Sequence, residues 1–130
     1  MRIFMTRWFG RFARKERLAE DALRDAVHRA ERGQIDADLG GGVIKQRVAR
    51  AGQGKSGGYR MILLYRTRAR AIFAYGFAKS RKQELDPDEL DAYRELAKAY
   101  LALAERSIDT YVADGTLSEI ADHEHEDQTP

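Results

Sequence analysis

Three consecutive β-strands are predicted within residues 43–79, which read VIKQRVARAGQGKSGGYRMILLYRTRARAIFAYGFAK. Residues 43–50 have the side-chain alternation of a strand. Residues 59–66 are apolar on both faces, which predicts a central strand. Residues 71–79 follow after a short turn. Because short connections join neighbouring strands, the three segments are expected to form an antiparallel meander.

Helical and strand patterns precede this meander. Ile3–Thr6 predicts a short strand. Trp8–Lys15 and Leu18–Arg32 carry apolar residues at helical spacing, and each predicts a helix. Thr6 is available to cap the first helix, and Gly33 is expected to end the second.

A further helix is predicted after the meander. Asp86 is a good N-cap, Pro87 suits the first helical position, and Glu89 completes a capping box. An apolar stripe at helical spacing then runs from Tyr93 to Tyr111, which predicts one long C-terminal helix.

These elements predict an α+β domain over residues 1–120, followed by an acidic tail at residues 121–130 that is expected to be disordered. The sheet is expected to be twisted and mainly antiparallel, with two N-terminal helices and the long C-terminal helix. Residues 116–120 can add a short strand. We expect the helices on one face of the sheet and the basic residues on the other.

Charge is segregated along the chain. Residues 1–82 contain 20 Lys and Arg against 7 Asp and Glu, whereas residues 83–130 contain 3 against 14. The net charge of +2 hides this division. A basic front with an acidic rear is expected when one face meets a polyanion such as nucleic acid.

Composition excludes several classes of protein. The chain has no cysteine, so it has neither a disulfide framework nor a thiolate site. It contains no apolar run near the ~20 residues that a membrane-spanning helix needs. Met1–Trp8 lacks the apolar stretch and cleavage site of a secretory signal, so a cytoplasmic protein without a membrane partner is expected.

Cations and aromatic residues alternate through the meander and the residues that follow it. By strand alternation, Lys45 and Arg47 share a face. Such a surface can bind phosphates and stack on bases, and the alternative is a solvated basic face above ordinary core aromatics. The candidate RNA-binding residues are Lys45, Arg47, Lys55, Tyr59, Arg60, Tyr75, Lys79, Arg81 and Lys82.

Two other motifs do not support a site. Gly54-Lys55-Ser56 resembles the end of a phosphate-binding P-loop, but Ala49 replaces its leading glycine and a strand follows instead of a helix. Residues 123–127 contain two histidines among acidic residues, without a scaffold to hold a metal. We therefore expect neither a metal site nor a cofactor.

Cations alone can catalyse one reaction, which is cleavage of RNA by its own 2′-hydroxyl. Fixed arginines can stabilise the negative charge of the phosphorane. A lysine whose pKa is lowered by neighbouring cations can remove the hydroxyl proton. For each cation taken singly, a plain phosphate contact is the alternative.

Three strings resemble the RelE/HigB-like toxins of type II toxin–antitoxin systems, and the HigB-like branch in particular. They are GGGVIKQRV at residues 40–48, GKSGGYR at residues 54–60 and FAYGFAK at residues 73–79. The similarity extends over roughly residues 3–112. It implies a RelE-like fold and a ribosome-dependent endoribonuclease that cleaves mRNA without a metal, inhibits translation and is held inactive by a cognate antitoxin with a helix-turn-helix.

The resemblance also implies roles for individual residues. Lys45 and Arg47 match two basic positions of the second family strand and would position or activate the 2′-hydroxyl. Arg60 matches the arginine that binds the scissile phosphate. Lys79 and Arg81 match basic residues that follow the last strand and would assist the leaving group.

One position departs from the family pattern. Where the best-known members have a tyrosine at the start of the final helix, this chain has Asp86. Either Tyr75 or Tyr59 substitutes for that tyrosine, or the chemistry relies on cations alone. The departure leaves two alternatives open: a toxin of the same fold that inhibits DNA gyrase without cleaving RNA, and a catalytically inactive RNA-binding relative.

Overall fold

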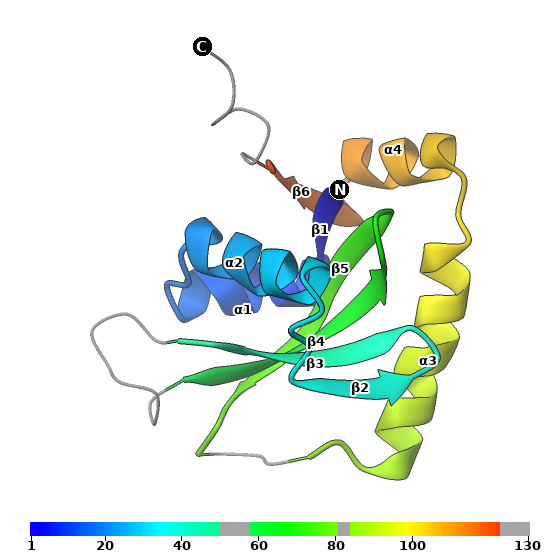
Figure 1. Cartoon of the computed structure of the whole chain (residues 1–130). Coiled ribbons are helices and arrows are strands. Elements are labelled where there is room, and N and C mark those ends of the chain that lie inside the picture. The colour runs from blue at the N-terminus through cyan, green and yellow to red at the C-terminus, as the bar shows by residue number, and fades with distance from the viewer. Residues whose placement is uncertain (50–57, 81–83, 123–130) are drawn as a thin grey trace.

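A computed structural model describes residues 1–49, 58–80 and 84–122. Within these ranges the chain forms four helices and one sheet of six strands, in the order β2-β3-β4-β5-β1-β6 (Figure 1). The elements are β1 (Arg2–Thr6), α1 (Arg7–Lys15), α2 (Glu20–Glu31), β2 (Ala37–Gly40), β3 (Val43–Val48), β4 (Tyr59–Arg66), β5 (Arg70–Ala78), α3 (Pro87–Leu101), α4 (Glu105–Ala113) and β6 (Leu117–Ile120).

The predicted meander is confirmed. Strands β3, β4 and β5 pair antiparallel in sequence order, and β4 lies between the other two. Strand β1 pairs with β5 in parallel, and β6 pairs antiparallel with β1. Strand β2, which pairs with β3 just before a glycine turn, was not predicted. Three of its four residues are alanine, aspartate and glycine, which are depleted in β-strands, so the sequence gives little indication of a strand there.

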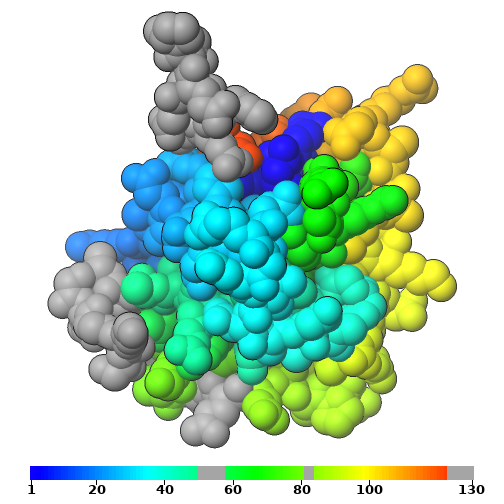
Figure 2. Space-filling view, viewed as in Figure 1, coloured from blue at the N-terminus to red at the C-terminus, as the bar shows by residue number. Residues whose placement is uncertain are grey.

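Helices cover both faces of the sheet, so the expectation that they pack on one face is wrong. Helices α1 and α2 lie on one side and α3 on the other (Figure 1). In the same view, α2 and the β2–β3 segment, drawn in blue to cyan, lie over the middle of the molecule, with α3 in yellow along one side (Figure 2). The physical reason is that β4 and β5 are buried on both faces and need an apolar layer against each.

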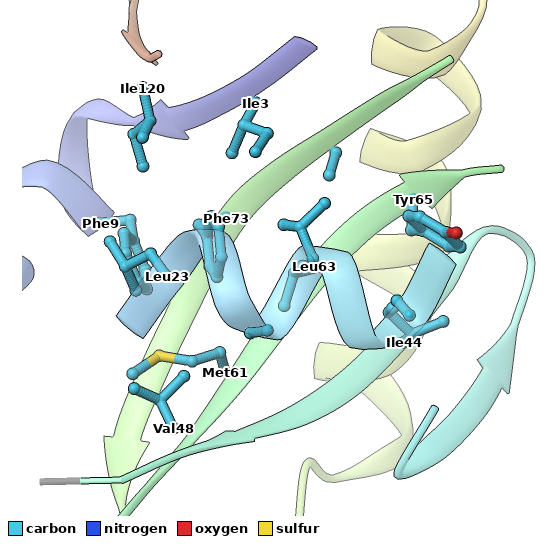
Figure 3. Packing of buried hydrophobic residues seen from close by; sticks show 14 of the residues in the cluster. Ile3, Phe9, Leu23, Ile44, Val48, Met61, Leu63, Tyr65, Phe73 and Ile120 are labelled. Carbon is cyan, nitrogen blue, oxygen red and sulfur yellow. The ribbon is translucent and has the colours of Figure 1, made fainter. Parts of the chain in front are cut away.

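Two clusters of buried side chains correspond to the two faces. On the side of α1 and α2, Phe9, Leu23 and Phe73 pack together between helix and sheet (Figure 3). On the other side, Ile62 and Ile72 of the sheet belong to a cluster with residues of α3 and α4. The sheet is therefore the central layer of the domain.

The predicted long C-terminal helix is divided into α3 and α4. Arg70, which is 5% exposed, donates from Nη1 to the Tyr100 carbonyl at 2.8 Å and from Nη2 to Glu105 Oε1 at 2.8 Å. One buried guanidinium thus contacts the last turn of α3 and the first residue of α4. The apolar stripe continues across the break because both helices bury it against the same face of the sheet.

The predicted helix caps are confirmed. The Thr6 hydroxyl accepts from the Phe9 backbone N–H at 3.2 Å. Asp86 accepts from the Glu89 backbone N–H at 2.8 Å, and the Glu89 side chain accepts from the Asp86 N–H at 3.0 Å. These bonds form the capping box of α3. Most of the predicted acidic tail, residues 123–130, lies outside the described part.

Candidate nucleic-acid interface

The predicted cations of β3 and β4 lie side by side on the face that α3 covers. Strand pairing sets Arg47 opposite Arg60, and Lys45 opposite Ile62. On β5, aromatic residues continue both rows across the sheet. The two rows are Lys45–Ile62–Tyr75 and Arg47–Arg60–Phe77. We call Lys45, Arg47 and Arg60 the cationic patch.

Helix α3 leaves the patch accessible because its C-terminal part packs over the other end of β3. A Cβ added at Gly42, where the turn into β3 has φ +85°, would lie 3.5 Å from Ala97 Cβ and 2.9 Å from Leu101 Cδ1. Farther along β3, Lys45 is half-buried and Arg47 is exposed. The register thus carries the cations out from beneath the helix.

The charges of the patch are not neutralised within the described part of the chain. Lys45, Arg47, Arg60 and Lys79 form no ion pair with any carboxylate of residues 1–49, 58–80 or 84–122. By contrast, other arginines are engaged in ion pairs with acidic side chains. They are Arg2, Arg24, Arg29, Arg70 and Arg94. The patch is therefore available to an external anion.

A hollow of about 260 Å³ lies beside the patch, between α2 and the ends of β3 and β4. Arg47 and Arg60 both line it, and Arg29 of α2 contributes a further guanidinium. Arg29 is oriented by Asp25 at 3.0 Å and by Asp36 at 3.6 Å. Asp25 also lines the hollow, and the Arg29 guanidinium is engaged by Asp25, Asp36 and the Arg47 carbonyl. A phosphate in the hollow would therefore be bound by Arg47 and Arg60.

Aromatic rings border the patch along β5. The Tyr75 ring centroid lies 4.7 Å from that of Trp8, and 6.0 Å from those of Phe77 and Tyr93. Burial, with smaller effects of Tyr75 and Glu89, raises the pKa of Tyr93 to about 12. Tyr93 therefore remains a neutral hydroxyl at physiological pH.

Tyr59 does not belong to this surface, so its predicted role in stacking on RNA is wrong for this structure. It is 1% exposed and faces α1, because it alternates with its neighbour Arg60 along β4. Its hydroxyl donates to Glu16 Oε1 at 2.7 Å, and its ring meets the Phe12 ring edge-on at 5.8 Å.

The remaining predicted site residues lie near or beyond the limits of the described part. Lys79 is exposed just after β5, where its backbone N–H donates to the Gly58 carbonyl at 3.1 Å. Asp86 stands where the best-known family members have a tyrosine, and its side chain takes part in the capping box of α3. The residues that fall outside the described ranges are Lys55, Arg81 and Lys82.

Sequence reasoning missed three residues of this region. Their sequence patterns place Trp8 and Tyr93 only in apolar helix stripes, and nothing local marks Arg29 of α2 as a neighbour of the patch. Trp8 is 41% exposed, which places it partly outside the core. The available signal was that Trp8 lies in a helix rich in arginine and without any acidic residue.

Other kinds of site find no support in the described residues. None of the helices there combines the length and hydropathy needed to cross a membrane. The same part of the chain contains no group of three or more His, Cys, Asp or Glu residues placed to hold a metal ion.

Comparison with known proteins identifies one family. The model of the family described as "RelE toxin of RelE / RelB toxin-antitoxin system" matches residues 1–120. No curated protein matches the chain.

Proposed function

The chain belongs to the RelE toxin family of toxin–antitoxin systems, and from this premise we propose that it is a metal-independent endoribonuclease that cleaves mRNA on the ribosome. The observation that carries the proposal is the cationic patch, in which three cations share one face and none is paired with a described carboxylate. Membership of the family implies an antitoxin partner.

In the proposed reaction, the 2′-oxygen of the RNA attacks the adjacent phosphorus. The bond between phosphorus and the 5′-oxygen breaks, which leaves a 2′,3′-cyclic phosphate and a 5′-hydroxyl. Arg60 stabilises the charge of the phosphorane, as a fixed guanidinium can. Lys45 and Arg47 position the 2′-hydroxyl and favour transfer of its proton to water. Lys79, with Arg81, stabilises the departing 5′-oxygen, which takes a proton from the Lys79 ammonium or from water and becomes the 5′-hydroxyl.

The patch supports this assignment because it concentrates cations of two neighbouring strands on one face. Arg47 and Arg60 are direct partners on the adjacent strands β3 and β4, and both line the hollow that Arg29 also borders. A phosphate held there would contact the guanidinium groups of Arg47 and Arg60. Tyr75 lies in the same row as Lys45, which makes it the candidate to replace the family tyrosine at the position of Asp86.

A cytoplasmic expression experiment tests the proposal. Induction without the antitoxin should arrest growth, and primer extension on translated messages should reveal new 5′ ends. Arg60→Ala should reduce cleavage by about a hundredfold to a thousandfold, because one donor to a developing oxyanion is worth roughly 3–4 kcal/mol. Arg60→Lys should restore only part of the activity, since lysine lacks the planar fork.

Arg32→Ala is the matched control, because Arg32 is an exposed arginine that ends α2 and lies outside the patch. It should leave cleavage unchanged. Intact messages combined with DNA breakage would instead indicate the gyrase inhibitor. RNA binding without cleavage by the unmodified chain would indicate the inactive relative.

A further inference from the structure

We propose that α1 provides a nucleotide-binding subsite next to the cationic patch, in which a base of single-stranded RNA packs against Trp8 and Phe12 and its phosphate is held by Arg11 and Lys15. The proposal deepens the endoribonuclease assignment and rests on RNA being the ligand. It concerns residues that no part of the cleavage scheme uses.

The subsite is a hollow on the exposed side of α1. Its volume is about 220 Å³, and its lining residues are Trp8, Arg11, Phe12 and Lys15. The rings of Trp8 and Phe12 are nearly parallel, with centroids 5.3 Å apart and planes inclined by 14°. A base can therefore extend this stack by packing on the exposed surface of Trp8, with the Phe12 ring beside it.

The two charged residues that line this hollow are both cations. Helix α1 reads RWFGRFARK and contains no acidic residue. Its Arg11 and Lys15 are exposed and form no ion pair with a carboxylate in the described part of the chain. Aromatic rings flanked by free cations are the combination with which proteins bind single-stranded nucleic acid.

A ring contact between Trp8 and Tyr75 links the hollow to the row of residues that contains Lys45. The Tyr75 ring lies 4.7 Å from that of Trp8, and Tyr75 pairs across the sheet with Ile62, whose other neighbour is Lys45. Neighbouring strands are about 4.8 Å apart, so Lys45 and Tyr75 are separated by roughly 10 Å. A strand held at the patch would therefore place a nearby nucleotide over α1.

The burial of α1 favours RNA over a membrane surface as the ligand. A cationic helix that binds a membrane inserts its apolar face into the lipid. In this chain Phe9 and Ala13, on the apolar side of α1, are buried in the core. The helix consequently offers cations and two aromatic rings, but no free apolar face.

Fluorescence tests the subsite directly, because Trp8 is the chain's one tryptophan. The probes are a 2′-O-methyl RNA hexamer, which lacks the attacking hydroxyl, and a hexamer of the same charge made of abasic 2′-O-methyl residues. The RNA hexamer should quench Trp8 emission. The abasic hexamer should bind about tenfold more weakly and leave the emission unchanged, since base stacking on an aromatic ring supplies that much affinity.

Substitutions distinguish the contribution of the Trp8 ring to RNA affinity from that of the Arg11 charge. Trp8→Leu should weaken hexamer binding about tenfold, whereas Trp8→Phe should weaken it less than about threefold, because phenylalanine keeps a flat ring. Arg11→Ala should lower the slope of log affinity against log salt by about 0.7, and Arg32→Ala should not. Circular dichroism melting would establish that each variant is folded.

Three outcomes would overturn the subsite. In the first, the hexamer binds without quenching and Trp8→Leu keeps full affinity. This would show that RNA is the ligand but that Trp8 does not contact it. Full cleavage by Trp8→Leu and Arg11→Ala in cells, alongside inactive Arg60→Ala, would preserve the endoribonuclease and reject the subsite. Absence of hexamer binding together with binding to anionic vesicles would reject RNA on this helix.

Discussion

Arg47 and Arg60 lie directly opposite each other on the antiparallel strands β3 and β4. Side chains in such a pair have Cβ atoms about 5 Å apart, and like charges at that distance destabilise a sheet. Neither guanidinium is paired with a carboxylate in the part of the chain that the structure describes. A pair that opposes folding is expected where function requires concentrated charge.

The first prediction follows from this repulsion. Arg47→Gln and Arg60→Gln should each raise the free energy of unfolding by up to about 1 kcal/mol, and the double variant should gain less than the sum. Urea unfolding of the four proteins measures the coupling. Destabilisation by both single variants would show that the arginines support the fold.

The second prediction concerns the contact between β5 and α1. A Cβ on Gly76 would lie 2.7 Å from the Phe12 ring and 2.8 Å from Met61 Sδ, so Gly76→Ala should destabilise the protein by about 1–3 kcal/mol. Gly10→Ala is the control, because the nearest atom to its added Cβ would be Arg14 Nη1 at an ordinary 3.6 Å. It should stabilise α1 by about 0.5–1 kcal/mol. Thermal melting distinguishes the two, and equal effects would contradict the packing.

The third prediction concerns Arg70, which joins α3 to α4. Arg70→Met should lower the free energy of unfolding by about 2 kcal/mol, since the Tyr100 carbonyl and Glu105 lose a charged donor. Glu105→Gln should have a smaller effect, because the Glu105 side chain is 61% exposed. Chemical denaturation checks both, and an Arg70→Met protein of unchanged stability would contradict the role of this bridge.

Acid should weaken the same bridge. Hydrogen bonds from Arg2 and then Arg70 lower the pKa of Glu105 below its ordinary value of 4.5. A depressed carboxyl pKa stabilises the fold above the unfolded value, and this stabilisation is lost as the pH falls through the folded value. Glu105→Gln should therefore flatten the loss of stability below pH 4.5, as measured by urea unfolding across that range.

The fourth prediction concerns alkaline pH and Tyr93. Burial raises the pKa of Tyr93 from 10.0 to about 12, so the folded state keeps its proton while the unfolded state releases it. The corresponding stabilisation is complete below pH 10.0 and is lost as the pH rises towards about 12. Tyr93→Phe should make stability less dependent on pH in this interval. Ultraviolet titration of the phenols and urea unfolding at each pH measure the effect, and an unchanged pH profile in Tyr93→Phe would contradict it.

Local signals in the sequence predicted most of the strands and helix ends. The meander, the strand at Arg2–Thr6, and the caps at Thr6 and Asp86 were all predictable. Each depends on side-chain periodicity or on a hydrogen bond that spans three residues, so no distant partner is needed. The break between α3 and α4 was not predictable, because it involves Arg70, which lies 30 residues from Tyr100.

The sequence by itself determined the strands, the caps and the alternation that puts Lys45 and Arg47 on one face. Only the tertiary structure decided which aromatic rings accompany them: α1 covers the face of β4 that holds Tyr59, while Trp8 reaches Tyr75. The reason is that periodicity assigns a side chain to a face of its own element, whereas strand order and helix packing decide what covers that face.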